Sequence, residues 1–277
     1  VDRFGRGRVQ VNRQKLQRTR DLLGVMRVSV FAPDDLVIVK GGPSDRRRFL
    51  DDALVALRTS YDALRLELDR VVRQRNSLLK QARGTLTDEV AVTLDVWDAR
   101  FVDVGDRLGT ARATLVARCQ PMVAEAYEQL AGVAVPVELV YEPEWRQRGL
   151  AAALAAARDD DVRRGVSTVG PHRDELLIGL GGMPARTHAS QGEQRTLALA
   201  LRLAAHRLVA ERTESTPVLV LDDVLSELDP DRATALLANL PAGQIVITTA
   251  SPLPPAARPE RIVEISGGAI VAAEVPS

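Results

Sequence analysis

Residues 190–195 read SQGEQR and open a long stretch rich in leucine and alanine. Ser190 and Glu193 have the S-x-x-E spacing of a capping box, in which the serine oxygen and the glutamate carboxylate satisfy free N–H groups at a helix start. Gly192 lets the backbone come close to whatever faces that start. Because the free N–H groups lie at the positive end of the helix dipole, such a start is an anion site. The stretch therefore predicts a buried helix that begins at Ser190 and faces an anion.

Residues 217–223 read PVLVLDD. A continuous aliphatic run after a proline is typical of a parallel strand that is buried on both faces. The run ends in Asp222 and Asp223, and α/β folds place their chemistry at the carboxyl ends of parallel strands. Two acids in that position could hold Mg²⁺ and polarise a water. A capped core helix beside a core strand with solvated acids is the alternative for either piece alone, and the ordered combination disfavours it.

SQGEQR followed by LVLDDVLSELD at residues 219–229 resembles the signature motif, Walker B motif and D-loop of the ABC/SMC-type ATPases. Among these ATPases, the motif residues are most similar to those of the RecF family of bacterial recombinational-repair proteins. Further blocks agree with that family: FAPDDL at residues 31–36, KGGPSDRRRFLD at 40–51 and GPHRDEL at 170–176. The resemblance thus spans nearly the whole chain.

The resemblance implies a role for each motif residue. Asp222 would hold the Mg²⁺ of a bound ATP through water, and Asp223 would be the catalytic residue that orients or deprotonates the attacking water. Most ABC proteins have a glutamate there, and the shorter aspartate predicts slow hydrolysis. The residues expected to contact ATP bound to the other protomer are Ser190, Gln191, Gly192 and Glu193, and those expected at the dimer interface are Ser226 and Asp229.

Two departures from the family pattern limit this reading. No G-x-x-x-x-G-K-[ST] phosphate loop occurs, and the glycines beside Lys40 follow it instead of preceding it. RecF-like proteins carry the loop near the N-terminus, so we expect this chain to lack that Walker A segment and to be inactive alone. ABC proteins usually have a γ-phosphate-sensing histidine after the strand predicted at residues 244–249, where this chain has Thr248 and Thr249.

Charge, cysteine content and the length of apolar runs narrow the classes of protein to which this chain can belong. The formal net charge is zero, so overall charge does not argue for nucleic acid. The single cysteine, Cys119, excludes an intramolecular disulfide framework and fits a reducing cytoplasm. The apolar run at residues 150–157 is shorter than the roughly 18 residues of a membrane span. We therefore expect a cytoplasmic, nucleoid-associated protein without membrane contact.

The N-terminal 20 residues carry seven basic groups and one acid. Residues 8–12 alternate like a strand, and Asn12 suggests the turn of a hairpin. A basic ribbon of this kind fits a DNA backbone and fits equally well a solvated sheet edge that charge protects. The candidate DNA contacts are Arg6, Arg8, Arg13, Lys15 and, from the GPHRDEL block, Arg173.

From Ser44 the pattern changes to long helices. Apolar residues from Leu50 to Leu78 recur in steps of four and three, interrupted only by Arg75. These residues form a first apolar seam along a helix. A polar break at residues 84–88 separates it from a second apolar seam, Val90 to Met122, which Arg118 interrupts. Two such helices form an antiparallel hairpin. It is similar to the short arm of RecF-like proteins, although a helical core subdomain without a binding role is the simpler interpretation.

The predicted architecture is an α/β ABC/SMC-type P-loop ATPase head, incomplete at its N-terminus, with an inserted helical arm. The head would comprise residues 1–45 and 165–277, and the arm (lobe II) residues 46–164. The resemblance implies an ATP-dependent homodimeric clamp on double-stranded DNA, at its junctions with single-stranded gaps, which helps to load RecA with RecR and RecO. The alternatives are another ABC-class ATPase, such as an SMC-like protein or a transporter subunit, and a non-catalytic binding fragment.

Overall fold

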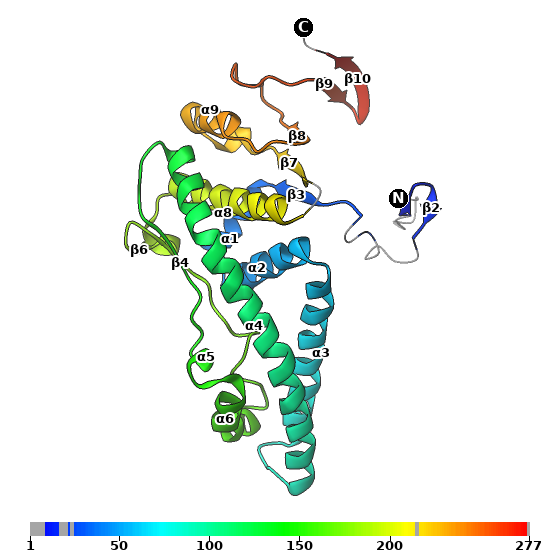
Figure 1. The fold of residues 1–277 in the computed structure, drawn as a ribbon, viewed down its shortest axis with the longest axis vertical. Coiled ribbons are helices and arrows are strands. Elements are labelled where there is room, and N and C mark those ends of the chain that lie inside the picture. The colour runs from blue at the N-terminus through cyan, green and yellow to red at the C-terminus, as the bar shows by residue number, and fades with distance from the viewer. Residues whose placement is uncertain (1–8, 17–21, 23–24, 214–215, 276–277) are drawn as a thin grey trace.

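The structure is a computed structural model that describes residues 9–16, 22, 25–213 and 216–275. The molecule is elongated, with a small parallel sheet and helix α8 (Gln191–Arg212) at one end and a helical arm leading away from them (Figure 1). Within the described residues, no helix is both long and apolar enough to cross a membrane.

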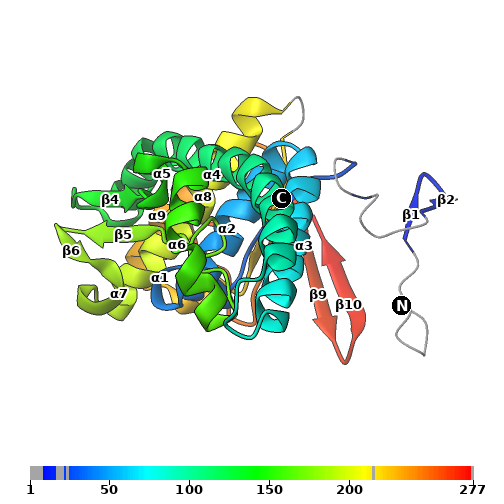
Figure 2. The ribbon, with the colours of Figure 1, turned by 90° about the horizontal axis from the view of Figure 1, so that it is seen from below.

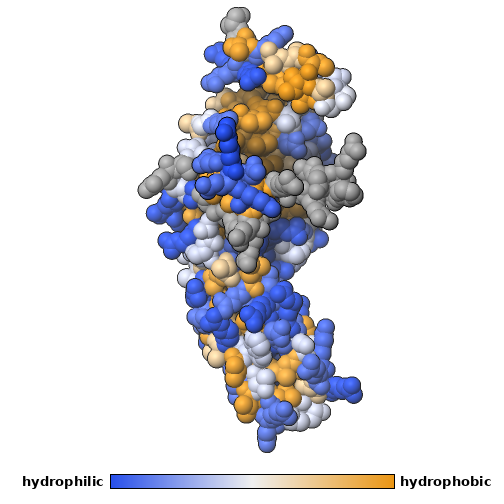
Figure 3. Space-filling model, turned by 90° about the vertical axis from the view of Figure 1, so that its right-hand side faces the viewer, coloured by the Kyte–Doolittle hydropathy of each residue, from blue (hydrophilic) through white to orange (hydrophobic). Residues whose placement is uncertain are grey.

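The parallel sheet has the order β3-β7-β8, built from β3 (Val28–Phe31), β7 (Val218–Asp222) and β8 (Ile245–Thr248). Leu219 and Leu221 point to the face that α8 covers and are buried. The described residues leave the opposite face open, and Val28, Val30 and Val246 on it are 41, 47 and 42 % exposed. Figure 3 shows a recessed apolar surface in this upper part of the molecule. The prediction that β7 is buried on both faces is therefore wrong for this structure, because α8 packs on one side only.

The arm consists of α2 (Pro43–Leu57), α3 (Ser60–Gln81) and α4 (Asp88–Ala131), followed by α6 (Leu150–Arg164). The antiparallel pairing of α3 with α4 confirms the predicted hairpin (Figure 1). The first seam, however, is divided between two helices, since Arg58 is extended with φ −153° and ψ 118°. Thr59 and Ser60 are weak helix formers, yet the apolar spacing continues through them, so periodicity could not show the break.

A second, antiparallel sheet joins β4 (Val137–Val140) to β5 (Leu177–Leu180), and β6 (Met183–Pro184) lies beside β5. The segment that leads into the GPHRDEL block, residues 166–169, forms no strand. The Ser167 N–H donates to Asn76 Oδ1 at 2.7 Å, and the Thr168 N–H donates to Asp161 Oδ1 at 2.8 Å. Side chains of α3 and α6 thus take up the backbone donors that a ladder would use.

The N-terminal hairpin predicted from the sequence is confirmed, and a second hairpin lies at residues 262–274. The first pairs β1 (Gln10–Val11) with β2 (Gln14–Lys15), and Asn12 and Arg13 have the positive φ values of a tight turn. The second pairs β9 (Ile262–Ser266) with β10 (Ala269–Glu274). The two hairpins lie apart from each other and outside the helical body (Figure 2). The remaining short elements are η2 (Pro33–Leu36), α1 (Val37–Lys40), α5 (Trp145–Arg148), α7 (Ala185–His188), η3 (Leu225–Glu227) and α9 (Pro230–Ala238).

Candidate nucleotide and dimer site

The start of α8 has the predicted capping box. Ser190 Oγ accepts a bond from the Glu193 N–H at 3.3 Å, and Glu193 Oε2 accepts one from the Ser190 N–H at 2.7 Å. This pairing with Ser190 holds the pKa of the Glu193 carboxyl below its usual value. Gln191 is exposed and Gly192 half-buried. Because the glutamate is engaged in the cap, the groups left to face outward at this helix start are backbone N–H groups and the exposed Gln191 side chain.

Arg232, on α9, is a neighbour of this helix start that the sequence did not indicate. A Cβ added to Gly192 would lie 2.5 Å from Arg232 Nη1, so the glycine leaves room for the guanidinium. Arg232 also pairs with Asp229 at 3.2 Å, and Asp229 caps α9 by accepting a bond from the Arg232 N–H at 2.9 Å. Arg232, itself paired with Asp229, therefore places a guanidinium beside the positive end of the α8 dipole.

Asp222 and Asp223 lie at the carboxyl end of β7, and both contact the neighbouring strand through Thr248. The Thr248 hydroxyl donates to Asp222 Oδ1 at 2.5 Å, while Thr248 O accepts from the Asp223 N–H at 3.0 Å. Asp222 points to the open face of the sheet, opposite α8. Thr248 thus orients the first acid. A polar residue at the end of β8 was the only sequence signal for this contact.

Asp223 has φ +52°, a left-handed conformation that is uncommon for a residue other than glycine. Its Oδ1 is buried and has no hydrogen-bond partner among the described residues. Such an oxygen needs a water, an ion or a donor from a partner molecule. Mg²⁺ is commonly held by one or two carboxylates together with waters and substrate phosphates. The pair of acids fits that requirement, although the described residues contain no cluster of three or more metal-ligating side chains.

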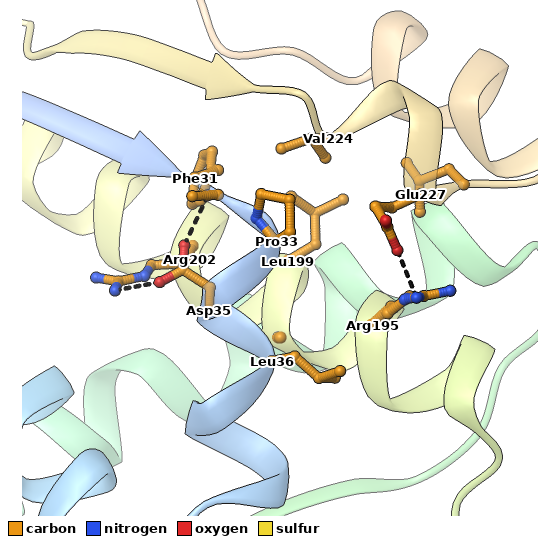
Figure 4. A pocket seen from close by; sticks show the side chains of 12 residues that line it. Phe31, Pro33, Asp35, Leu36, Arg195, Leu199, Arg202, Val224 and Glu227 are labelled. Carbon is orange, nitrogen blue, oxygen red and sulfur yellow. Dashed lines mark hydrogen bonds and ion pairs between the residues drawn. The ribbon is translucent and has the colours of Figure 1, made fainter. Parts of the chain in front are cut away.

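The segment after β7 connects these acids to α8. The Ser226 hydroxyl donates to Asp223 O at 2.8 Å, and Arg195 of α8 forms an ion pair with Glu227. Between α8, η2 and η3 lies a small, largely apolar cavity of about 50 Å³ (Figure 4). On its far side Arg202 pairs with Asp35 at 2.5 Å. The FAPDDL block is therefore attached to the signature-like helix, a contact that no single motif predicted.

The GPHRDEL block is tied into the arm through a buried polar network. Asp174 is 4 % exposed and accepts bonds from the Tyr141 hydroxyl and, at 2.7 Å, from Trp145 Nε1. Arg46 forms a bidentate pair with Glu175 at 2.6 and 3.1 Å, and Arg47 donates to Asp174 O at 2.7 Å. The blocks at residues 40–51 and 170–176 thus pack together. Most of their polar side chains take part in contacts that hold the fold.

The basic residues predicted to contact DNA have different surroundings. Arg6 and Arg8 lie outside the described residues. Arg13 and Lys15 are exposed on the β1–β2 hairpin. Arg173 is exposed and donates through Nε to Ser167 O at 3.3 Å. Their contact with DNA stays a prediction.

His172 gives the stability of the chain a measurable pH dependence. Its ring lies 5.6 Å from that of Phe101, and burial lowers its pKa to about 4, with Arg173, Arg47 and Arg75 adding repulsion. The unfolded chain, whose histidine has a pKa of about 6.5, binds the proton more readily. We expect this histidine to lower the free energy of unfolding by up to about 1.4 kcal/mol per pH unit as the pH falls from about 6.5 to 4.

Urea unfolding of the wild type and of His172→Gln at half-unit pH steps measures this contribution. The difference between the two proteins isolates the histidine from other groups that titrate in the window. The glutamine amide can still donate to Ser167 O, which His172 Nε2 contacts at 3.1 Å. Parallel stability curves for the two proteins would contradict the buried neutral histidine.

Comparisons with known proteins agree with this geometry. No protein-family model matches the chain. The DNA replication and repair protein RecF of Streptomyces avermitilis is 44 % identical over 259 residues, which cover 88 % of this chain and 69 % of that protein. Two structures of the recombination mediator protein RecF in the RecFOR pathway, described as RecF-ATPrS and RecF-ATP, superpose with a TM-score of 0.80 each. They are 28 and 27 % identical to this chain, covering 94 and 98 % of it and 71 and 73 % of theirs.

A more distant likeness concerns the fold alone. The Smc head domain of Pyrococcus furiosus superposes with a TM-score of 0.53 at 15 % identity, covering 98 % of this chain and 70 % of that one. The α/β head with its helical arm therefore has the ABC/SMC-type ATPase fold, as the motifs predicted. With 44 % identity to a relative over more than two thirds of that relative's length, the chain belongs to the RecF family of DNA replication and repair proteins.

Proposed function

We propose that this chain acts in DNA repair as part of an ATP-dependent dimeric clamp on DNA. The observation that carries the proposal is the combination of a capped, outward-facing α8 start with two strand-end acids, one of which has an orphaned oxygen. The similar structures of RecF-ATP and RecF-ATPrS support ATP as the nucleotide that this site would bind. The head would comprise residues 1–45 and 165–277, and the arm residues 46–164.

In the proposed site each protomer contributes its α8 start to ATP held by its partner. The backbone N–H groups at Gln191 and Gly192, with Arg232 beside them, would face the γ-phosphate. Asp222, which Thr248 orients, would hold Mg²⁺ through water, and Asp223 would hold the attacking water. Bound Mg²⁺ supplies charge neutralisation at the phosphates. Ser226 and Asp229 would lie at the interface between the heads.

DNA and protein partners follow from the family. The joined heads would bind double-stranded DNA near its junction with a single-stranded gap and act with RecR and RecO to help load RecA. A second proposal concerns the 277 residues as they stand. Their sequence contains no Walker A motif, so they would act as a non-catalytic binding unit that does not hold ATP tightly alone.

The test is a titration with a fluorescent ATP analogue and Mg²⁺. The 277-residue chain is compared with a hybrid in which the phosphate-loop segment of a RecF relative precedes Val1. We expect only the hybrid to bind the analogue and to dimerise with it, and Asp222→Asn to weaken the dependence on Mg²⁺. Tight binding by the 277-residue chain itself would mean that other residues hold the phosphates.

The role of the α8 start has its own variant pair in the hybrid. Ser190→Arg should leave analogue binding unchanged and abolish ATP-dependent dimerisation, because the long side chain would fill the space for the partner's phosphate. Ser190→Ala removes the same cap, at a cost of about 1 kcal/mol, without filling that space, and should still dimerise. Light scattering with and without nucleotide measures both. Equal dimerisation of Ser190→Arg and the wild type would place the interface elsewhere.

A further inference from the structure

The break between α2 and α3 opens a groove on the arm side of the head. Where α2 ends, α3 turns away along α4 (Figure 1), and the space between α2, α3, α4 and the C-terminal end of α8 is about 830 Å³. The seam residues Leu54, Leu57 and Leu64 form part of its lining, with Leu208 of α8. A continuous helix through Arg58, as the periodicity predicted, would not leave this opening.

Four arginines and one aspartate line the groove: Arg58, Arg107, Arg118, Arg212 and Asp106. Arg107 lies 3.8 Å from Asp103, an exposed and weak pair. The other three arginines have no ion-pair partner in the described part of the chain. The charge on Asp106 interacts chiefly with Arg146, which does not line the groove. The four arginines therefore outnumber the one carboxylate that lines this space, which we call the arginine groove.

Several arginines elsewhere in the described chain are paired with carboxylates. The arginines that are paired within 3.5 Å include Arg46, Arg65, Arg75, Arg112, Arg158 and Arg202. Arg58 and Arg212 lie where α2 and α8 end, and each helix end contributes about half a negative charge. Four cations, one aspartate and two such ends leave the groove with a net charge of about +2. The helix dipoles reduce the positive field there and do not cancel it.

We propose that the arginine groove binds a short run of single-stranded DNA. Guanidinium groups match phosphate oxygens in a planar, bidentate geometry, so Arg58, Arg118 and Arg212 would contact successive phosphates of one strand. Tyr61, which is partly buried against the core, lines the same groove and offers a ring for a base to stack on. The apolar floor would take sugar and base edges. This assignment rests on the proposed DNA-binding function.

The combination of features favours a single strand over a duplex. Sites for single strands combine a basic groove that follows the backbone with aromatic rings that stack on unpaired bases. The bases of a duplex are stacked on one another and present no free face to Tyr61. The proposal also makes the binding of gapped DNA more specific. The single-stranded side of the junction would lie along the start of α3 and the middle of α4.

The test measures binding of a labelled oligo-dT to the 277-residue chain by fluorescence anisotropy, without nucleotide and at several salt concentrations. Arg58→Ala, Arg118→Ala and Arg212→Ala should each lower the affinity about fivefold and reduce the slope of log affinity against log salt by about 0.7. Tyr61→Ala should lower the affinity at least about fivefold and leave that slope unchanged, and Tyr61→Phe should bind like the wild type.

Arg70→Ala and Arg73→Ala are matched controls, because both arginines are exposed on α3 outside the groove. Urea midpoints verify that each variant is folded. Unchanged affinity in the triple arginine variant, equal losses in the controls, or no binding of oligo-dT by the wild type would overturn the proposal. Equal losses on blunt duplex together with no effect of Tyr61→Ala would overturn the single-strand assignment. Because nucleotide is absent, failure here is distinct from failure of ATP-dependent dimerisation.

Discussion

Arg75→Met should lower the free energy of unfolding by about 3–5 kcal/mol, the usual cost of leaving one member of a buried ion pair alone. Arg75 is fully buried, and it donates to Asp98 Oδ1 and to Asp161 Oδ2 at 2.6 Å each. Its Nη1 also donates to Ser167 Oγ at 2.9 Å. Methionine fills much of the space and cannot balance Asp161, whose side chain has no exposure. The loss therefore comes from an uncompensated buried charge.

Urea unfolding of the wild type and the variant measures this loss. Arg73→Met, on the exposed side of the same helix, should change stability by no more than about 0.5 kcal/mol. In Arg75→Met/Asp161→Asn the buried charge is gone, while the asparagine oxygen can still accept from Thr168, so at least half of the lost stability should return. A loss below about 1 kcal/mol in Arg75→Met would show that the network contributes little.

Arg112→Met should have an effect of similar size, about 3–5 kcal/mol, at the other polar cluster. Arg112 is 2 % exposed and forms a bidentate pair with Asp51, with both bonds at 2.8 Å. Its remaining nitrogen donates to Pro171 O at 2.7 Å. One side chain of α4 thus holds α2 and the GPHRDEL block together, and the substitution leaves Asp51, which is 7 % exposed, without its cation.

A double-mutant cycle with Asp51→Asn separates the pair from the rest of the packing. The coupling energy should reach about 1–3 kcal/mol, because the two groups are in direct contact and buried. Arg107→Met is the control on the same helix, since Arg107 is 61 % exposed and its nearest carboxylate lies 3.8 Å away. Additive losses in the cycle would mean that Arg112 acts through packing alone.

Interactions between residues close in the sequence were sufficient to predict much of the fold. The capping box at Ser190, the strand that ends in two acids, the antiparallel helical hairpin and the N-terminal hairpin were predicted from residues close together in the sequence. Each depends on short-range rules: a cap satisfies N–H groups three residues away, and an apolar period selects helix or strand. The same motifs led to the RecF family, which the comparisons established.

The two arginines that interrupt the predicted seams illustrate what periodicity leaves open. Arg75 and Arg118 occupy equivalent positions in the apolar pattern, but Arg75 is buried between acids of α4 and α6, while Arg118 lines an open groove. Nothing within a few residues of either arginine distinguishes them. The surroundings of Arg75 depend on Asp98 and Asp161, which are 23 and 86 positions away in the sequence. Those of Arg118 depend on the helix break at Arg58, 60 residues earlier.

The sequence by itself determined the capped helix at Ser190, the strand that ends in two acids, the helical hairpin, the motif residues and the family resemblance. Only the tertiary structure decided that α2 and α3 are separate, that Thr248 orients Asp222, that Arg232 lies beside Gly192 and that the family blocks at 40–51 and 170–176 interlock. The physical reason is the range of the contacts. Caps and periodic faces are set within one or two helical turns, whereas buried ion pairs and grooves arise from side chains that meet only when distant elements pack.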